Sequence, residues 1–230
     1  MKPVNIGIIG AGGIVQHRHL PGLTAIPDVR ITAVCNRSQE SGEKVAQQWN
    51  IPRVLTDWRA LIALDDLDAV LIGTWPYMHA EMSIAALQAG KHVFCQARMA
   101  RTAAEARAML VASESRPDLV AMLCPPPNGM KGDRLIRKLL ADGYLGEPRE
   151  VHATGLSAAN LDPTAPLHWR QDFDLQGYNT LTLGMWMEVL HRWMGPHRKV
   201  AAVLKTFTPT RRDPQTSTQK EVRIAESVAI

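Results

Sequence analysis

The residues with the clearest chemical meaning form a glycine-rich turn near the start of the chain. Gly10, Gly12 and Gly13 follow the apolar run 4–9, and a helix-compatible stretch begins at Ile14. The first glycine permits a tight turn, and the second lets the backbone approach a ligand closely. A helix start offers free N–H donors and a positive dipole end to an anion. This order of strand, turn and helix predicts a site for the pyrophosphate of a dinucleotide.

Two neighbouring features bear on this interpretation. Val15 stands at the third position of the glycine pattern, where glycine or alanine is usual. An ordinary tight turn without a ligand therefore stays open as an alternative. A second strand-like run, 29–35, follows at the spacing of one strand–helix–strand unit, which favours the dinucleotide site.

The turn after this second strand bears on the choice of dinucleotide. It contains Asn36, Arg37 and Ser38, and no carboxylate occurs before Glu40. Arg37 can pair with a 2′-phosphate and Ser38 can donate a hydrogen bond, which favours NADP. Asn36 can also bond a ribose hydroxyl, which keeps NAD open. The alternative is that Ser38 caps the next helix and Arg37 is solvated.

Composition excludes several function classes. The chain has 230 residues and a net charge of +4, which suits anionic small ligands and does not indicate nucleic acid. The basic doublet Arg211-Arg212 is expected in a solvated loop. We expect no membrane contact, since no apolar run reaches the roughly 18 residues of a span. The cysteines have no CxxC spacing, so we expect no metal site and buried, reduced thiols in a cytoplasmic protein.

The first half of the chain alternates between strand and helix patterns. Strands are expected at 4–9, 30–35, 69–73, 91–95 and 119–124. Helices are expected at 13–25, 39–49, 57–63, 79–89 and 102–115, with a capping box from Thr102 and a C-terminal cap at Gly90. This alternation predicts an α/β domain with a doubly wound parallel sheet covered on both faces.

The pattern changes at the three prolines of segment 124–129, which we interpret as a domain junction. We expect a Rossmann NAD(P)-binding domain at 1–124 and an α+β second domain with a mostly antiparallel sheet at 125–230. Its expected elements are helices 131–141 and about 178–194, strands 147–155, 199–208 and 220–230, and an irregular segment 156–175. The chain stops inside an apparent strand, so we expect this second domain to be incomplete.

Four segments together resemble the Gfo/Idh/MocA family of NAD(P)-dependent oxidoreductases, and they span most of the chain: 8–14, 73–81, 86–95 and 139–148. The resemblance implies that Thr74, Pro76, His79 and Gln96 contact the cofactor. It also implies a homo-oligomer, because the family uses the open sheet of its second domain for oligomer contacts and substrate binding.

The chain departs from the family where the chemistry is expected. The family usually carries Glu-Lys-Pro where this chain has Gln96-Ala97-Arg98, so alanine stands in place of the lysine that reaches nicotinamide and substrate. Thr182 and Trp186 stand where the family presents an Asp and a His for proton transfer. Alanine cannot relay a proton, and Arg98, which stays protonated, can serve only as an electrostatic anchor.

The remaining candidates for proton transfer are His79, Tyr77, Glu188 and His191. Each has a plainer alternative. His79 can simply cap the helix that begins there, and Glu188 with His191, three residues apart on one helix, can form a solvated pair.

Three functions follow from the resemblance and its departures. The first is an oxidoreductase that acts on a sugar- or cyclitol-like polyhydroxylated small molecule. The second is a non-catalytic dinucleotide-binding sensor or partner subunit. The third is a lyase- or hydrolase-like enzyme that keeps its NAD(P) tightly bound.

Overall fold

The computed structural model describes residues 3–124, 132–180 and 182–230. The chain divides into two compact units, Met1–Cys124 and Pro125–Ile230, and each is described by itself. The predicted proline junction falls in 125–131, outside the described residues.

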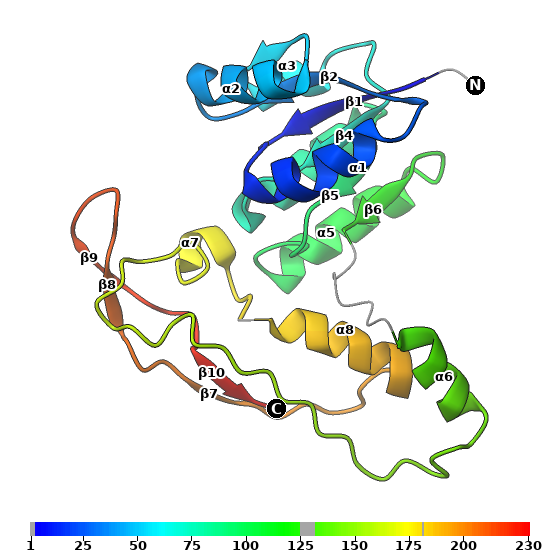
Figure 1. Ribbon diagram of the computed structural model, residues 1–230, viewed down its shortest axis with the longest axis vertical. Helices are drawn as coiled ribbons and strands as arrows, with labels where there is room; N and C mark the ends of the chain where they lie inside the picture. Colours follow the sequence, from blue (N-terminus) through cyan, green and yellow to red (C-terminus); the bar gives the residue numbers. More distant parts are fainter. Residues whose placement is uncertain (1–2, 125–131, 181) are drawn as a thin grey trace. The chain divides into compact units, whose positions relative to one another are not determined.

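The first unit contains a six-stranded sheet in the order β3-β2-β1-β4-β5-β6, in which every neighbouring pair is parallel (Figure 1). The strands are β1 (Val4–Ile9), β2 (Val29–Cys35), β3 (Val54–Leu55), β4 (Ala69–Ile72), β5 (His92–Cys95) and β6 (Ala121–Leu123). The predicted doubly wound α/β fold is confirmed. The strand order reverses direction at β1, and ligands of such sheets bind beyond the carboxyl ends at this point.

Successive strand residues point to opposite faces of the sheet, and helices cover both faces. Ile9 and Ile72 join a core cluster with residues of α3 (Trp58–Ile62), α4 (His79–Gln88) and α5 (Ala103–Glu114). Ile8 and Leu71 join a second cluster with residues of α1 (Leu20–Thr24) and α2 (Gln39–Trp49). This alternation is what a period of two predicts for a sheet buried on both sides.

The predicted helix ends of this unit are confirmed. The Thr102 hydroxyl accepts a hydrogen bond from the Glu105 N–H at 3.1 Å and starts α5. Gly90 has a φ of +78° and directly follows Ala89, the C-cap residue of α4. The predicted helix 13–25 contains a π-helical segment, Val15–His19, ahead of α1. Pro21 lacks an N–H, and the Leu20 N–H bonds the Val15 carbonyl in the wider turn.

The described part of the second unit contains the helices α6 (Asp133–Ala141), α7 (Phe173–Gln176) and α8 (Leu183–Met194). Two antiparallel ladders join β7 (Val203–Lys205) to β10 (Ser227–Ala229) and β8 (Thr210–Arg212) to β9 (Gln219–Glu221). An α+β unit with antiparallel pairing is therefore confirmed, and each of its two sheets joins two strands among the residues that the structure describes.

Several predicted boundaries in this unit were wrong. Residues 147–155 form no strand, because no other described segment pairs with them. The strands expected at 199–208 and 220–230 shorten to β7, β9 and β10. The end of the predicted irregular segment 156–175 overlaps α7, which continues to Gln176. The helix expected from 178 starts at Leu183, because Asn179 Nδ2 donates to the Gln176 carbonyl at 2.6 Å and holds a loop there.

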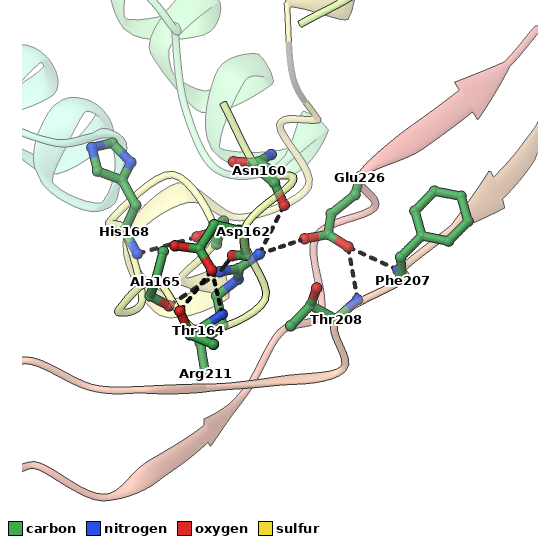
Figure 2. A network of polar contacts seen from close by, with 10 residues as sticks. Asn160, Asp162, Thr164, Ala165, His168, Phe207, Thr208, Arg211 and Glu226 are labelled. Atoms are coloured by element: carbon green, nitrogen blue, oxygen red, sulfur yellow. Dashed lines mark hydrogen bonds and ion pairs between the residues drawn. The ribbon is translucent and has the colours of Figure 1, made fainter. Parts of the chain in front are cut away.

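Arg211 was expected in a solvated loop, and this was wrong: it is only 2% exposed, while Arg212 is exposed. Its guanidinium donates to the backbone carbonyls of Asn160, Asp162 and Ala165 and pairs with Glu226 at 3.2 Å (Figure 2). The other Glu226 oxygen accepts from the N–H groups of Phe207 and Thr208, each at 2.8 Å. The buried polar residues of this region therefore hold its segments together through hydrogen bonds and an ion pair.

Candidate functional site

The glycine turn lies at the carboxyl end of β1, where the sheet changes direction. Gly10 has a φ of +81°, and a Cβ there would lie 2.8 Å from the backbone nitrogen of Thr74. Its N–H donates to the Cys35 carbonyl at 2.8 Å, which ties the turn to the end of β2. Both the conformation and the close approach of β4 therefore require glycine at this position.

The outer side of the same turn is open. A Cβ on Gly12 would meet no atom within 4 Å, and one on Gly13 would meet only the His17 ring, at 3.9 Å. Ile14, at the start of the helix, is 46% exposed. The first N–H groups of a helix have no partner within it. The turn therefore forms a backbone cradle that fits a pyrophosphate.

The departure at the third glycine position has a structural compensation. Val15 is fully buried, and a Cβ on Gly73 would lie 2.3 Å from its Cγ2 and 2.6 Å from the Gly10 carbonyl oxygen. The space that the helix needs against the sheet is thus left by a glycine at the end of β4. A valine in the fingerprint is therefore compatible with the close packing that the site requires.

The three predicted residues after β2 have different surroundings. Asn36 Oδ1 accepts the Ala11 N–H at 2.8 Å, and its Nδ2 donates to the Ser41 carbonyl, so this side chain braces the glycine turn. Ser38 is the N-cap of α2 and accepts the Ser41 N–H, as its plainer alternative predicted. Arg37 is exposed, and its guanidinium lies 5.0 Å from the ring centre of Trp75.

His79 is fully buried, and both of its ring nitrogens face backbone carbonyls. Nδ1 lies 2.7 Å from the Arg98 oxygen and Nε2 lies 2.9 Å from the Thr74 oxygen. Burial lowers the pKa of His79, although the carbonyls favour its charged form. Pro76 is buried in the short turn Pro76–Met78 that precedes α4. This histidine therefore joins the loop after β4 to the loop after β5.

The loop after β5 carries the segment that departs from the family. The Gln96 N–H donates to the Ile72 carbonyl at 2.8 Å, and the Gln96 side-chain oxygen lies 2.7 Å from His19 Nε2. Ala97 and Arg98 are half-buried, and the peptide bond between them is cis. The structure thus gathers the predicted residues of the first unit at the carboxyl ends of β1, β2, β4 and β5.

His191 belongs to the second unit. It lies on the last turn of α8, is exposed, and its Nε2 faces His197 Nδ1 at 2.5 Å. Glu188 is also exposed on this helix. The structure brings no second predicted site residue into contact with His191 among those it describes.

Three residues of the site were missed by sequence reasoning: Gly73, Trp75 and His19. Gly73 and Trp75 lie in the segment that resembles the family, but only the fold shows that one faces Val15 and the other faces Arg37. His19 lies one helical turn beyond Val15, and that spacing was the available signal.

Other kinds of site find no support in the described residues. They contain no group of three His, Cys, Asp or Glu side chains that could hold a metal ion. No helix among them has the length and apolar character to cross a bilayer. Burial raises the pKa of the Cys35 thiol to about 11 and that of the Cys95 thiol to about 12, so neither is an activated nucleophile.

Comparisons with known proteins agree with this geometry. The model of an oxidoreductase family with an NAD-binding Rossmann fold, Gfo/Idh/MocA, matches residues 4–143. The chain is 29% identical to the levoglucosan dehydrogenase of Pseudarthrobacter phenanthrenivorans over 92% of its own length and 56% of that protein. It is 30% identical to an inositol 2-dehydrogenase of Pseudomonas savastanoi over 83% of its length and 54% of that protein.

Solved structures show the same likeness. An oxidoreductase domain protein from Kribbella flavida superposes with a TM-score of 0.87 at 29% identity, covering 99% of this chain and 64% of that one. A levoglucosan dehydrogenase in complex with NADH has a TM-score of 0.81 at 25% identity, with 99% and 62% covered. The chain spans little more than half the length of the curated relatives it matches.

Proposed function

We propose that this chain, which belongs to the Gfo/Idh/MocA oxidoreductase family, is an NAD(P)-dependent oxidoreductase. Its proposed substrate is a sugar- or cyclitol-like polyhydroxylated small molecule. The relatives named levoglucosan dehydrogenase and inositol 2-dehydrogenase support this substrate class. The observation that carries the proposal is the open cradle at Gly12 and Gly13, at the point where the sheet changes direction.

The bound dinucleotide would supply hydride transfer. Gly13 and Ile14 at the helix start would hold its pyrophosphate through backbone N–H groups. Gly12, whose own N–H donates to the Gly10 carbonyl at 2.8 Å, would leave room for the phosphates to approach. Asn36 would keep the turn in place from the end of β2 through its bond to Ala11. His79, which is fully buried, would position the loops that carry Thr74 and Arg98 rather than transfer a proton itself.

Two roles concern the substrate. Arg98 would anchor an electronegative group, since its guanidinium stays charged near neutral pH. His191, which is exposed and faces a second imidazole, would be the candidate for proton transfer. Both roles are assigned to other residues because alanine stands at position 97, where the family carries its lysine.

A titration of the purified chain with NADH, followed by nucleotide fluorescence, tests the cradle. Gly12→Asp should weaken NADH binding by at least about a hundredfold, because its carboxylate fills the cradle and repels the pyrophosphate. Gly22→Asp is the matched control, since Gly22 in α1 also has no atom within 4 Å of its Cβ position. Equal affinity of the two variants, or a wild type that binds neither NADH nor NADPH, would overturn the proposal.

For the choice of dinucleotide, we propose that NADPH is preferred and that Arg37 is the determinant. Arg37 is exposed at the end of β2, whereas Asn36 and Ser38 are already engaged by the backbone. Arg37→Ala should lower the preference for NADPH over NADH about tenfold, the size of one charge-assisted hydrogen bond. Arg30→Ala removes the same charge near the start of β2 and should leave the ratio unchanged.

A second candidate function, a non-catalytic dinucleotide-binding sensor or partner subunit, is favoured by Ala97. If it holds, the wild type should bind nucleotide and oxidise neither levoglucosan nor myo-inositol. Ala97→Lys should then create activity with one of them, whereas an active wild type would refute this alternative. Nucleotide that stays bound through gel filtration and is never released would instead indicate a lyase- or hydrolase-like enzyme that keeps its NAD(P) tightly bound.

Two broader proposals accompany the function. We propose a homo-oligomer, which light scattering on the purified chain would test. We also propose that the protein works in the cytoplasm, which the three cysteines support because they form no disulfide.

A further inference from the structure

A histidine that the proposed mechanism does not use joins two of the loops that form the site. His19 ends the π-helical segment that follows the glycine turn, and Gln96 directly follows β5. His19 Nε2 lies 2.7 Å from Gln96 Oε1, and the imidazole meets the Phe94 ring edge-on at 5.3 Å between centres. Both side chains are half-buried, so neither is closed off from solvent.

This contact determines which end of the Gln96 amide is offered outward. Oε1 can only accept, so His19 must donate through Nε2–H. The Gln96 Nε2 group, which can donate two hydrogen bonds, has no further partner within the described residues. A hydrogen bond from His19 therefore fixes an amide whose donor end remains available to a ligand.

The order of the strands indicates which part of a dinucleotide would lie there. The pyrophosphate cradle follows β1, and the residues suited to the adenosine ribose follow β2. β4 and β5 lie on the other side of β1, so the nicotinamide half would extend toward them. Gln96 is the first residue after β5 and precedes Ala97, where the family lysine is missing.

We propose that His19 is a positioning residue for the nicotinamide: it holds Gln96 so that the Gln96 Nε2–H donates to the carboxamide oxygen of the nicotinamide. This inference rests on the proposed dinucleotide function and adds to it a residue and a direction of hydrogen bonding. In this arrangement His19 contacts Gln96 and Phe94.

The two interactions of His19 can be separated by substitution. His19→Phe keeps a ring against Phe94 and removes the donor, whereas His19→Gln keeps a donor amide and removes the ring. The probes are NADH and ADP-ribose, which lacks the nicotinamide. His19→Phe and Gln96→Ala should each weaken NADH binding about fivefold, the size of one hydrogen bond, and leave ADP-ribose binding unchanged. His19→Gln should bind NADH within about twofold of wild type.

The double variant His19→Phe/Gln96→Ala should be no weaker toward NADH than either single variant, because both remove the same interaction. Equal losses for NADH and ADP-ribose, or a loss in His19→Gln with none in His19→Phe, would show that His19 only packs the helix and would overturn the inference. A wild type that binds neither probe would instead refute the dinucleotide function on which the inference rests.

Discussion

The two units of this chain are stabilised by different kinds of contact. In the first unit, apolar side chains are buried on both faces of a parallel sheet, and the core includes residues from all of its longer helices. In the second, the described buried residues include five apolar side chains and four polar ones: Gln171, Asp172, Gln176 and Arg211. The apolar contacts of the first unit are spread over many side chains, whereas the second unit, with few buried residues, depends more strongly on each polar contact.

Arg211→Met should produce the largest effect and confine it to the second unit. The variant leaves the Glu226 carboxylate buried without its cation and leaves three backbone carbonyls without a donor. We expect a loss of about 3–5 kcal/mol in the free energy of unfolding of this unit. Hydrogen exchange in peptides from 156–168 and 203–212 should accelerate, while exchange in β1 and β4 stays unchanged.

Arg212→Met is the matched control for this prediction, since Arg212 is the exposed neighbour in the same strand. Its effect should stay within about 0.5 kcal/mol. Equal effects of the two substitutions would mean that the buried network does not hold the second unit together.

Gly73→Ala tests whether the first unit has a comparable weak point. Its Cβ would lie 2.3 Å from Val15 Cγ2 and 2.6 Å from the Gly10 carbonyl oxygen, and a backbone oxygen cannot rotate away. We expect a loss of about 3 kcal/mol by thermal unfolding. Gly12→Ala, with open space around its Cβ position, should unfold like the wild type. A stable Gly73→Ala variant would show that the sheet and helix can separate at little cost.

Lowering the pH should reduce the stability of the second unit through protonation of Glu226. Burial raises the pKa of Glu226, but the N–H groups of Thr208 and Phe207 and the Arg211 guanidinium outweigh it and hold the pKa below its usual 4.5. Because the folded-state pKa is the lower one, ionised Glu226 contributes stability above pH 4.5, and this contribution is lost as the pH falls through the folded value.

Glu226→Gln should therefore destabilise the second unit at pH 7 by less than Arg211→Met and should reduce the loss of stability of this unit as the pH falls below 4.5. Urea unfolding monitored by hydrogen exchange across these pH values checks both statements. An unchanged acid slope in the variant would mean that other carboxyl groups cause the loss.

The same contrast explains what the sequence could predict. Ile8 and Ile9, or Leu71 and Ile72, already reveal in sequence that a strand has two buried faces, and Gly10 and Gly12 mark the turn between strand and helix. Local spacing therefore predicted the sheet of the first unit and the cradle.

The rest depended on contacts between distant residues. Arg211 stands in a polar segment, and its burial depends on carbonyls about fifty residues away. Residues 147–155 carry a strand pattern but find no partner among the described segments. In the site, the contact between His19 and Gln96 joins residues that are 77 positions apart. Nothing in the sequence around either residue indicates that the two side chains meet.

The smallest predicted effect concerns a local contact in the first unit. Thr102→Ala removes the hydroxyl that accepts the Glu105 N–H at the start of α5 and should cost about 1 kcal/mol. Thr102→Ser keeps the oxygen and should cost much less. Thermal unfolding of both variants checks this. The loss should appear only in the first unit and should stay well below that of Arg211→Met, because the apolar core that α5 joins through Met109 is intact. A loss as large as that of Arg211→Met would mean that a single polar contact matters as much in the first unit as in the second, and that the contrast between them is wrong.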